Sequence, residues 1–407
     1  MRRTNGLACA ALVAAAGLAA AGERSRPIDC LPDRLAAWQA AEPDPETRFG
    51  ALSLPGIVLG PPGDSVAYQG SVTVASLGFG GRAVYAFDDL SIEDRPGPDF
   101  VVFENGFFAL PLPAAEEDEF LIFAEPGLVE VSLDGVDWRS FPYDAQALVD
   151  SIALGGSIDR GLYLRMVGLA GLTPTFTGNW TVPDDPAVFD PAGTAGVSGA
   201  GGDAFDLADV GLPSARFVRI TDAGTGAGFA GSAEGFDLDA LVVLHGRPGP
   251  APGVDQDHDG LSDAEEAVRY GSDPALADSD GDGVDDGREV ASCRDPASTS
   301  TAPWIVLEPA LWLAGSTCTE ARWTFVGSSV SYDLVRADGD AIGAVAGQVD
   351  LGSTTCLADS PLGVRWSCDA ETPLPGDWFG YLVRVGGATD WGRSSALEPR
   401  GTAQECP

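Results

Sequence analysis

The sequence predicts an all-β protein: a large N-terminal β-sandwich of jelly-roll type, a short acidic block, and a smaller C-terminal β-sandwich. Three observations support this prediction. Short runs rich in β-branched and aromatic residues recur between turn signals, with almost no helical periodicity. The chain contains 53 Gly and 30 Pro, as expected for many turns. Its 407 residues are enough for two or three domains.

The start of the chain, residues 1–21, has the pattern of a secretory signal peptide. Arg2 and Arg3 supply the positive charge, Leu7–Ala20 is apolar, and small residues around Ala21 allow cleavage. The apolar run is too short to span a bilayer stably, and no second long apolar run follows. We therefore expect a secreted protein, extracellular or at the cell surface, without a membrane span. A buried N-terminal helix is the alternative.

The charge and the cysteines narrow the function further. The 61 acids and 23 bases give a formal charge of −38, which repels phosphate backbones and anionic lipids, so we expect no nucleic-acid partner. Up to three disulfides are expected in an oxidising compartment. Sequence leaves open how they pair the six cysteines that follow the signal: Cys30, Cys293, Cys318, Cys356, Cys368 and Cys406.

Residues 22–245 carry the strand pattern of the first sandwich. Between Val129 and Leu133 apolar residues alternate with polar ones, as in a strand with one wet face, and Asp134–Gly135 indicates a tight hairpin. Eight runs are expected to be strands: Ser71–Leu77, Arg82–Phe87, Phe100–Phe103, Phe120–Phe123, Leu128–Leu133, Leu162–Val167, Arg216–Ile220 and Leu241–Leu244. So many short strands are typical of a jelly roll.

One stretch within this domain, Thr173–Ala208, is rich in Gly and Pro and reads as a single long loop. Loops of this length in compact domains are usually functional or disordered. Trp180 lies in it and is a candidate to stack on a sugar ring, with a structural role as the alternative.

After the first domain, residues 246–254 are expected to be a Pro/Gly linker. The acidic block follows over residues 255–296, and residues 302–407 again show strand patterns, at Trp323–Phe325, Ser331–Val335 and Gly380–Val385. About 100 residues suit a small sandwich of seven short strands.

The acidic block contains two copies of one loop, 23 residues apart. Each copy places oxygen donors at positions 1, 3, 5, 9 and 12, a glycine at position 6, and a main-chain carbonyl at position 7. The predicted ligands are Asp255, Asp257, Asp259, Leu261, Asp263 and Glu266 in loop 1, and Asp278, Asp280, Asp282, Val284, Asp286 and Glu289 in loop 2.

This spacing suits Ca²⁺, which takes six to eight hard oxygens, better than Mg²⁺, which demands strict octahedral geometry. A solvated acidic linker is the alternative. The loops, together with the step Gly271–Pro274, resemble bacterial thrombospondin type 3 repeats over residues 255–296. That resemblance implies a calcium-stiffened spacer and not a calcium sensor.

The two sandwiches also resemble known families. Val129–Trp138 and Ala215–Thr221 are similar to core strands of discoidin-type, galactose-binding-like domains. Pro96–Asn105, Gly201–Val210 and Gly235–Asp239 resemble a family of secreted bacterial cell-surface proteins with no established activity. The C-terminal segment is similar to fibronectin type III domains through Val330–Arg336 and Trp378–Arg384. Such domains are usually spacers or binding modules.

The first sandwich also offers a candidate for a second calcium site. It would be formed at one end of the sandwich by six acids: Asp99, Glu104, Asp203, Asp206, Asp237 and Asp239. The alternative is that these acids cap turns and strand ends by bonding local backbone.

These features together predict a non-enzymatic, calcium-binding protein of the cell surface that binds a glycan or surface polymer through its jelly roll. No catalytic constellation is recognisable in the sequence. A secreted carbohydrate-active hydrolase using carboxylates of the first domain is the rival hypothesis, and a purely structural spacer is the third.

Overall fold

A computed structural model confirms the all-β prediction: most elements are strands, and nearly all of them pair antiparallel. The expected signal peptide, Trp180 and most of the long loop lie outside the described residues. Those are 28–40, 48–63, 71–108, 121–175, 201–224, 235–251, 253–299, 311–314, 319–323, 332–339, 342–345, 348–359, 365–371, 373, 377–385 and 400–401.

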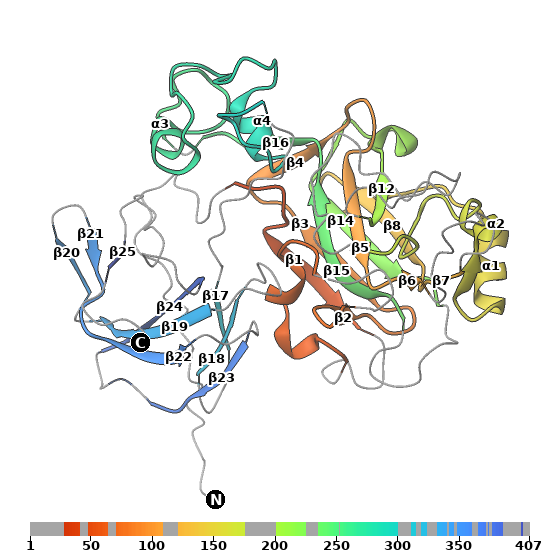
Figure 1. The fold of residues 1–407 in the computed structure, drawn as a ribbon, viewed down its shortest axis with the longest axis horizontal. Coiled ribbons are helices and arrows are strands. Elements are labelled where there is room, and N and C mark those ends of the chain that lie inside the picture. The colour runs from red at the N-terminus through yellow and green to blue at the C-terminus, as the bar shows by residue number, and fades with distance from the viewer. Residues whose placement is uncertain are drawn as a thin grey trace, which may run out of the picture.

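Two antiparallel sheets form the N-terminal sandwich (Figure 1). The first sheet contains, in spatial order, β1 (Arg34–Gln39), β3 (Arg82–Ala86), β14 (Phe217–Asp222), β8 (Gly127–Ser132) and β11 (Leu169–Ala170), with β9 (Arg139–Ser140) beside β8. The second contains β12 (Asp203–Phe205), β5 (Phe100–Glu104), β15 (Asp237–Val243) and β2 (Ala75–Ser76). Neighbouring strands lie far apart in sequence, so the connections cross between sheets, as in Greek-key sandwiches.

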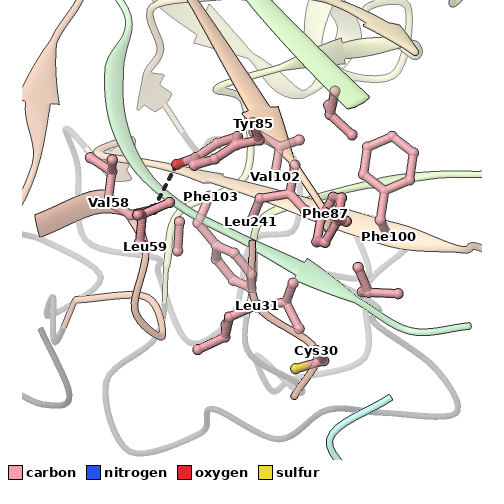
Figure 2. Close-up of a cluster of buried hydrophobic side chains, with 14 of the residues drawn as sticks. Cys30, Leu31, Val58, Leu59, Tyr85, Phe87, Phe100, Val102, Phe103 and Leu241 are labelled. Atoms are coloured by element: carbon pink, nitrogen blue, oxygen red, sulfur yellow. Dashed lines mark hydrogen bonds between the residues drawn. The ribbon is translucent and has the colours of Figure 1, made fainter. Parts of the chain in front are cut away.

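The core lies between these sheets. On β14 buried and partly exposed residues alternate, as expected for a strand with one wet face, whereas β15 is buried throughout. Figure 2 shows Phe103 of β5 and Leu241 of β15 in this core, with the phenol of Tyr85 from β3. That phenol donates a hydrogen bond to the carbonyl of Val58 (2.9 Å), so its polar end is satisfied although it is fully buried.

Two short three-stranded sheets complete the first domain. One contains β10 (Ser157–Asp159), β7 (Leu121–Phe123) and β6 (Phe107–Phe108), and the other β13 (Ser214–Ala215), β4 (Leu90–Glu93) and β16 (Gly246–Pro248). The linker expected over 246–254 therefore begins as a strand. Pro248 is compatible with pairing because β16 lies at the sheet edge, where a strand can spare an N–H.

The helices are short, and two of them correct the sequence-based assignment. They are η2 (Ala51–Ser53), η3 (Gly56–Val58), α1 (Ala145–Ala153), α2 (Arg160–Tyr163), η4 (Leu207–Val210), α3 (Asp263–Glu265), η5 (Glu266–Tyr270) and α4 (Asp286–Val290). The strand expected at Leu162–Val167 is instead α2 and a turn. Leu162 and Met166 are buried in one small cluster while Leu164 and Val167 are exposed, which is helical and not strand spacing.

The helix α1 was not expected from the sequence. Its start is capped by Asp144, whose carboxylate accepts hydrogen bonds from the N–H groups of Gln146 and Ala147. Its Ala147 is buried beside Leu162.

The predicted hairpin at Asp134–Gly135 forms, although β8 and β9 are joined by a longer turn than expected.

The acidic block packs against the first sandwich, beside β4 and β16 (Figure 1). Cys30 and Cys293 form a disulfide, and Val290 and Tyr270 belong to the same hydrophobic core as the sandwich. The Tyr270 hydroxyl accepts a hydrogen bond from the Ile28 N–H (2.9 Å). The block is thus anchored covalently and by burial, which the expectation of a spacer did not include.

The C-terminal segment forms small sheets whose strands include those expected near Trp323, Val335 and Leu382. The three sheets are β17 (Leu311–Ala314), β18 (Thr319–Trp323) and β23 (Arg365–Asp369); β22 (Thr354–Asp359), β19 (Tyr332–Asp338) and β24 (Phe379–Val385); and β20 (Gly343–Val345), β21 (Gln348–Asp350) and β25 (Arg400–Gly401). A buried ion pair between Arg336 and Asp369 (2.7 Å) links the first two. Cys356 is disulfide-bonded as well.

The Cys30–Cys293 bond yields a prediction about stability. Replacing both cysteines by alanine removes a cross-link over a sequence separation of 263, so the free energy of unfolding should fall by about 2–5 kcal/mol. Chemical denaturation of the full chain measures this change. An unchanged denaturation midpoint would show that packing alone holds the acidic block.

Candidate metal centre

The two acidic loops adopt the same backbone conformation. Gly260 and Gly283, at position 6, have φ of 100° and 99°. At position 4, His258 and Gly281 have φ of 68° and 80°. Only a glycine adopts the position 6 conformation easily, so the sharp turn explains why that residue recurs in both copies.

Matching hydrogen bonds shape the two loops. The position 1 carboxylates of Asp255 and Asp278 each accept from the N–H of position 4 (2.7 Å in both loops) and from that of position 6 (3.3 and 3.0 Å). The position 5 carboxylates of Asp259 and Asp282 accept from the N–H of position 7 (2.8 and 2.9 Å). These N–H groups hold the acidic side chains on the inside of each turn.

The position 9 residues also have the same partner in both loops, the N–H of position 2. Asp263 accepts from Gln256 (2.9 Å) and Asp286 from Ser279 (2.8 Å). Leu261 and Val284 were predicted as ligands through their carbonyls. The structure assigns hydrogen bonds to their N–H groups, and the carbonyl role stays a prediction.

Each loop gathers its first three carboxylates. One oxygen each from Asp255, Asp257 and Asp259 lie within 4.8 Å of one another, and the same holds for Asp278, Asp280 and Asp282. Several buried oxygens in the loops have no hydrogen-bond partner: both of Asp257, Oδ2 of Asp280, Oε2 of Glu266 and Oε2 of Glu289. The unpartnered oxygens belong to positions 3 and 12 in both copies.

A further group joins the two loops. Glu266, at position 12 of loop 1, lies with Asp259 of its own loop and Asp286 of loop 2, and all three are buried. The Gly287 N–H also donates to Asp259 (2.8 Å). These acidic groups consist of aspartate and glutamate alone, the donor chemistry of hard divalent cations, and each could hold a metal ion.

Burial and neighbouring carboxylates make the position 12 acids hard to ionise. The pKa of Glu266 is raised to about 8, first by burial and then by repulsion from Asp259 and Asp257. The pKa of Glu289 is raised to about 8 by burial and by Asp280 and Asp282. A divalent cation among these carboxylates would remove the repulsion and return them to the ionised form.

The six acids of the second predicted site do not converge. Asp99 and Asp206 lie with Asp94 near the start of β5, whereas Glu104, at its end, lies with Asp237 and Glu125. Asp99 and Glu104 lie at opposite ends of β5, so the length of the strand keeps the two groups of acids apart.

Two of these six acids bond local backbone: Asp206 accepts from the Ala208 N–H (2.9 Å) and Asp99 from the Arg95 N–H (3.1 Å). Three of the six accept from backbone that is distant in the sequence, which the alternative did not include. Asp99 accepts from the Leu207 N–H (2.7 Å), Asp203 from that of Leu172 (2.8 Å), and Asp239 from that of Gly63 (2.9 Å). Sequence reasoning missed Glu125, which lies between β7 and β8 in no recognisable motif.

Comparisons with known proteins add little. No protein-family model matches the chain, and comparison with curated proteins finds no match. One solved structure, described as "Biofilm associated protein - BSP domain", is similar to 73% of this chain at 12% identity and a TM-score of 0.11. This chain spans 53% of that structure's length, and so low a score supports no inference. Within the described part of the chain, no helix has the length and apolar character needed to cross a membrane.

The raised pKa values of Glu266 and Glu289 predict a pH dependence. In metal-free solution these acids hold protons in the folded state up to about pH 8, while in the unfolded chain they ionise near 4.5. The folded state therefore binds more protons between these values, and the free energy of unfolding falls as pH rises through this window.

Thermal unfolding in EDTA should accordingly give a higher Tm at about pH 5.5 than at about pH 8. The Glu266→Gln, Glu289→Gln double variant should show a smaller difference, because neither position can then ionise. Glu104, Asp203, Asp237 and Asp259, whose pKa values are also raised, keep the remainder. Equal pH slopes for the variant and the parent chain would place the titrating groups elsewhere.

Proposed function

We propose that this protein is a secreted, calcium-binding cell-surface protein whose two acidic loops bind Ca²⁺. The observation that supports the proposal best is the repetition, in both loops, of buried carboxylate oxygens without partners at positions 3 and 12. Such oxygens cost several kcal/mol unless a cation compensates them. The two sets share one backbone geometry.

Calcium is the proposed ion because of the donors. The acidic groups contain only oxygen donors. The donors predicted for each curled loop match the six to eight oxygen ligands that Ca²⁺ takes. Mg²⁺ binds poorly to such all-protein cages because it keeps several of its waters. The resemblance to thrombospondin type 3 repeats supports the same ion. Extracellular loops of this kind have a Kd of about 10⁻⁴–10⁻³ M.

We also propose a domain type for each of the two sandwiches. The crossed strand order of the first sandwich supports a discoidin-like jelly roll. The two three-stranded sheets β17–β18–β23 and β22–β19–β24 support a fibronectin type III-like sandwich. We infer that the first sandwich binds a glycan or surface polymer without catalysis, and that calcium fixes how it is presented.

Calcium binding is tested by substituting position 3 of both loops. The Asp257→Ala, Asp280→Ala double variant should lose about two bound Ca²⁺ in equilibrium dialysis of the full chain, and most of the calcium-dependent rise in Tm, since each ion at 100 times its Kd contributes about 2.7 kcal/mol. The matched control is Asp285→Asn, an exposed acid of loop 2 at a non-ligand position. Equal calcium binding by the double variant and the control would refute the assignment.

The ligand is tested by binding of the full chain to a glycan array, in calcium and in EDTA. We expect retention on a subset of glycans that EDTA reduces at least tenfold. Hydrolysis of a glycan that one Asp→Asn change in the first sandwich abolishes would favour the hydrolase. Absence of retention in both conditions would favour the structural spacer.

A further inference from the structure

A separate group of three acids lies inside the first sandwich, away from the loops. Glu104 is the last residue of β5, Asp237 is the first of β15, and Glu125 lies in the connection from β7 to β8. One oxygen of each lies within 4.8 Å of the other two. All three side chains are buried, with exposed fractions of 3%, 6% and 7% respectively.

Hydrogen bonds satisfy several oxygens of these three carboxylates, but one oxygen of Glu104 has no hydrogen-bond partner. Asp237 accepts from the hydroxyl of Ser76 and from the side-chain amide of Asn105 (3.2 Å). Oε1 of Glu125 accepts from the Gly235 N–H (3.1 Å), and Oε1 of Glu104 from the Asp237 N–H (3.2 Å). Oε2 of Glu104 is buried and has no hydrogen-bond partner, which is unusual for a native carboxylate.

The space beside that oxygen is lined by further oxygens. A methyl group added to Gly106 would lie 3.4 Å from Oε2 of Glu104, 3.6 Å from the carbonyl oxygen of Phe123 and 3.9 Å from that of Gly171. Carboxylates and main-chain carbonyls in one place are the ligand set of a hard divalent cation. The absence of a Cβ at residue 106 keeps this space open.

The charges around Glu104 also favour a bound cation. The described charges that act on Glu104 are those of Asp237 and Glu125, and both repel its ionised form. A positive ion would turn this mutual repulsion into attraction. Among hard cations, Ca²⁺ suits a dry site with three carboxylates, because Mg²⁺ gives up its waters reluctantly.

We propose that Glu104, Glu125 and Asp237 form a third Ca²⁺ site, independent of the two acidic loops. The ion would join β5 and β15 of one sheet to the connection that enters β8 of the other. The site therefore ties the two sheets of the sandwich together. It does not depend on the loop assignment, because none of its residues belongs to the acidic block.

Glu104→Gln in the full chain tests the site, and Glu130→Gln on the neighbouring β8 is the matched control, because Glu130 is already paired with Arg219. Equilibrium dialysis with Ca²⁺ should show one ion fewer for Glu104→Gln than for the control. The same difference is expected with the loops intact and in the Asp257→Ala, Asp280→Ala background. Failure of the loops to bind calcium is therefore distinguishable from failure of this site.

The Tm supplies a second readout that a purely structural carboxylate would not give. In EDTA, Glu104→Gln should unfold at a higher temperature than the parent chain, because it removes a buried carboxyl whose ionised form is repelled by Asp237 and Glu125. In saturating Ca²⁺ the order should reverse. Loss of one bound ion together with this reversal supports the site. Unchanged ion number, or a lower Tm in both conditions, would overturn it, and Glu125→Gln provides the same test if Glu104→Gln does not fold.

Discussion

Negative charge buried among other negative charges is the constraint on which the rest of this structure depends. The unpartnered carboxylate oxygens lie in the two loops and at Glu104. Removing such groups from water costs several kcal/mol each. Arginines compensate them only in part: Arg288, Arg336 and Arg384 pair with other acids. Arg294 lowers the pKa of Glu289, but burial and the neighbouring acids raise it further. The rest of the compensating charge must therefore come from protons or from cations in the solvent.

The anchoring of the acidic block determines what such a cation has to do. At its N-terminal side β16 pairs with β4, and at its C-terminal side Cys293 is bonded to Cys30. These two contacts involve no loop carboxylate, and they hold both ends of the segment on the sandwich. Ordering the loops between fixed ends costs less entropy than ordering a free linker, so more of the binding free energy of the ion remains as affinity.

The local pattern predicted some features well and others poorly, for a physical reason. The loops were predictable because the turn itself demands Gly260 and Gly283 at one spacing from the acids. The alternation predicted from Val129 is present on β8 at Val129, Glu130 and Val131, and it ends there, because Ser132 is buried and Leu133 is exposed. Glu125 and its approach to Glu104 could not be predicted, because that contact depends on how two sheets stack and not on any short motif.

Tertiary packing also explains the errors at Leu162–Val167 and at the linker. The apolar residues of the first stretch pack in a small cluster with Ala147 of α1. Nothing in the sequence next to that stretch predicts this contact. At Gly246–Pro248 an available edge of β4 converts a Pro/Gly-rich stretch into a strand. In both places the partner lies far away in the chain, so local composition alone pointed to the wrong structure.

The same packing changes the effect that ions bound at the proposed sites would have. A spacer stiffened by ions would set the distance between two independent domains. Here Tyr270 of the block and Trp323 of the C-terminal segment belong to one hydrophobic core with the first sandwich, and η3 contacts β18. Ions at the block and at Glu104 would then act on one continuous packed body. Their effect on ligand binding would be transmitted through that core and not through the length of a linker.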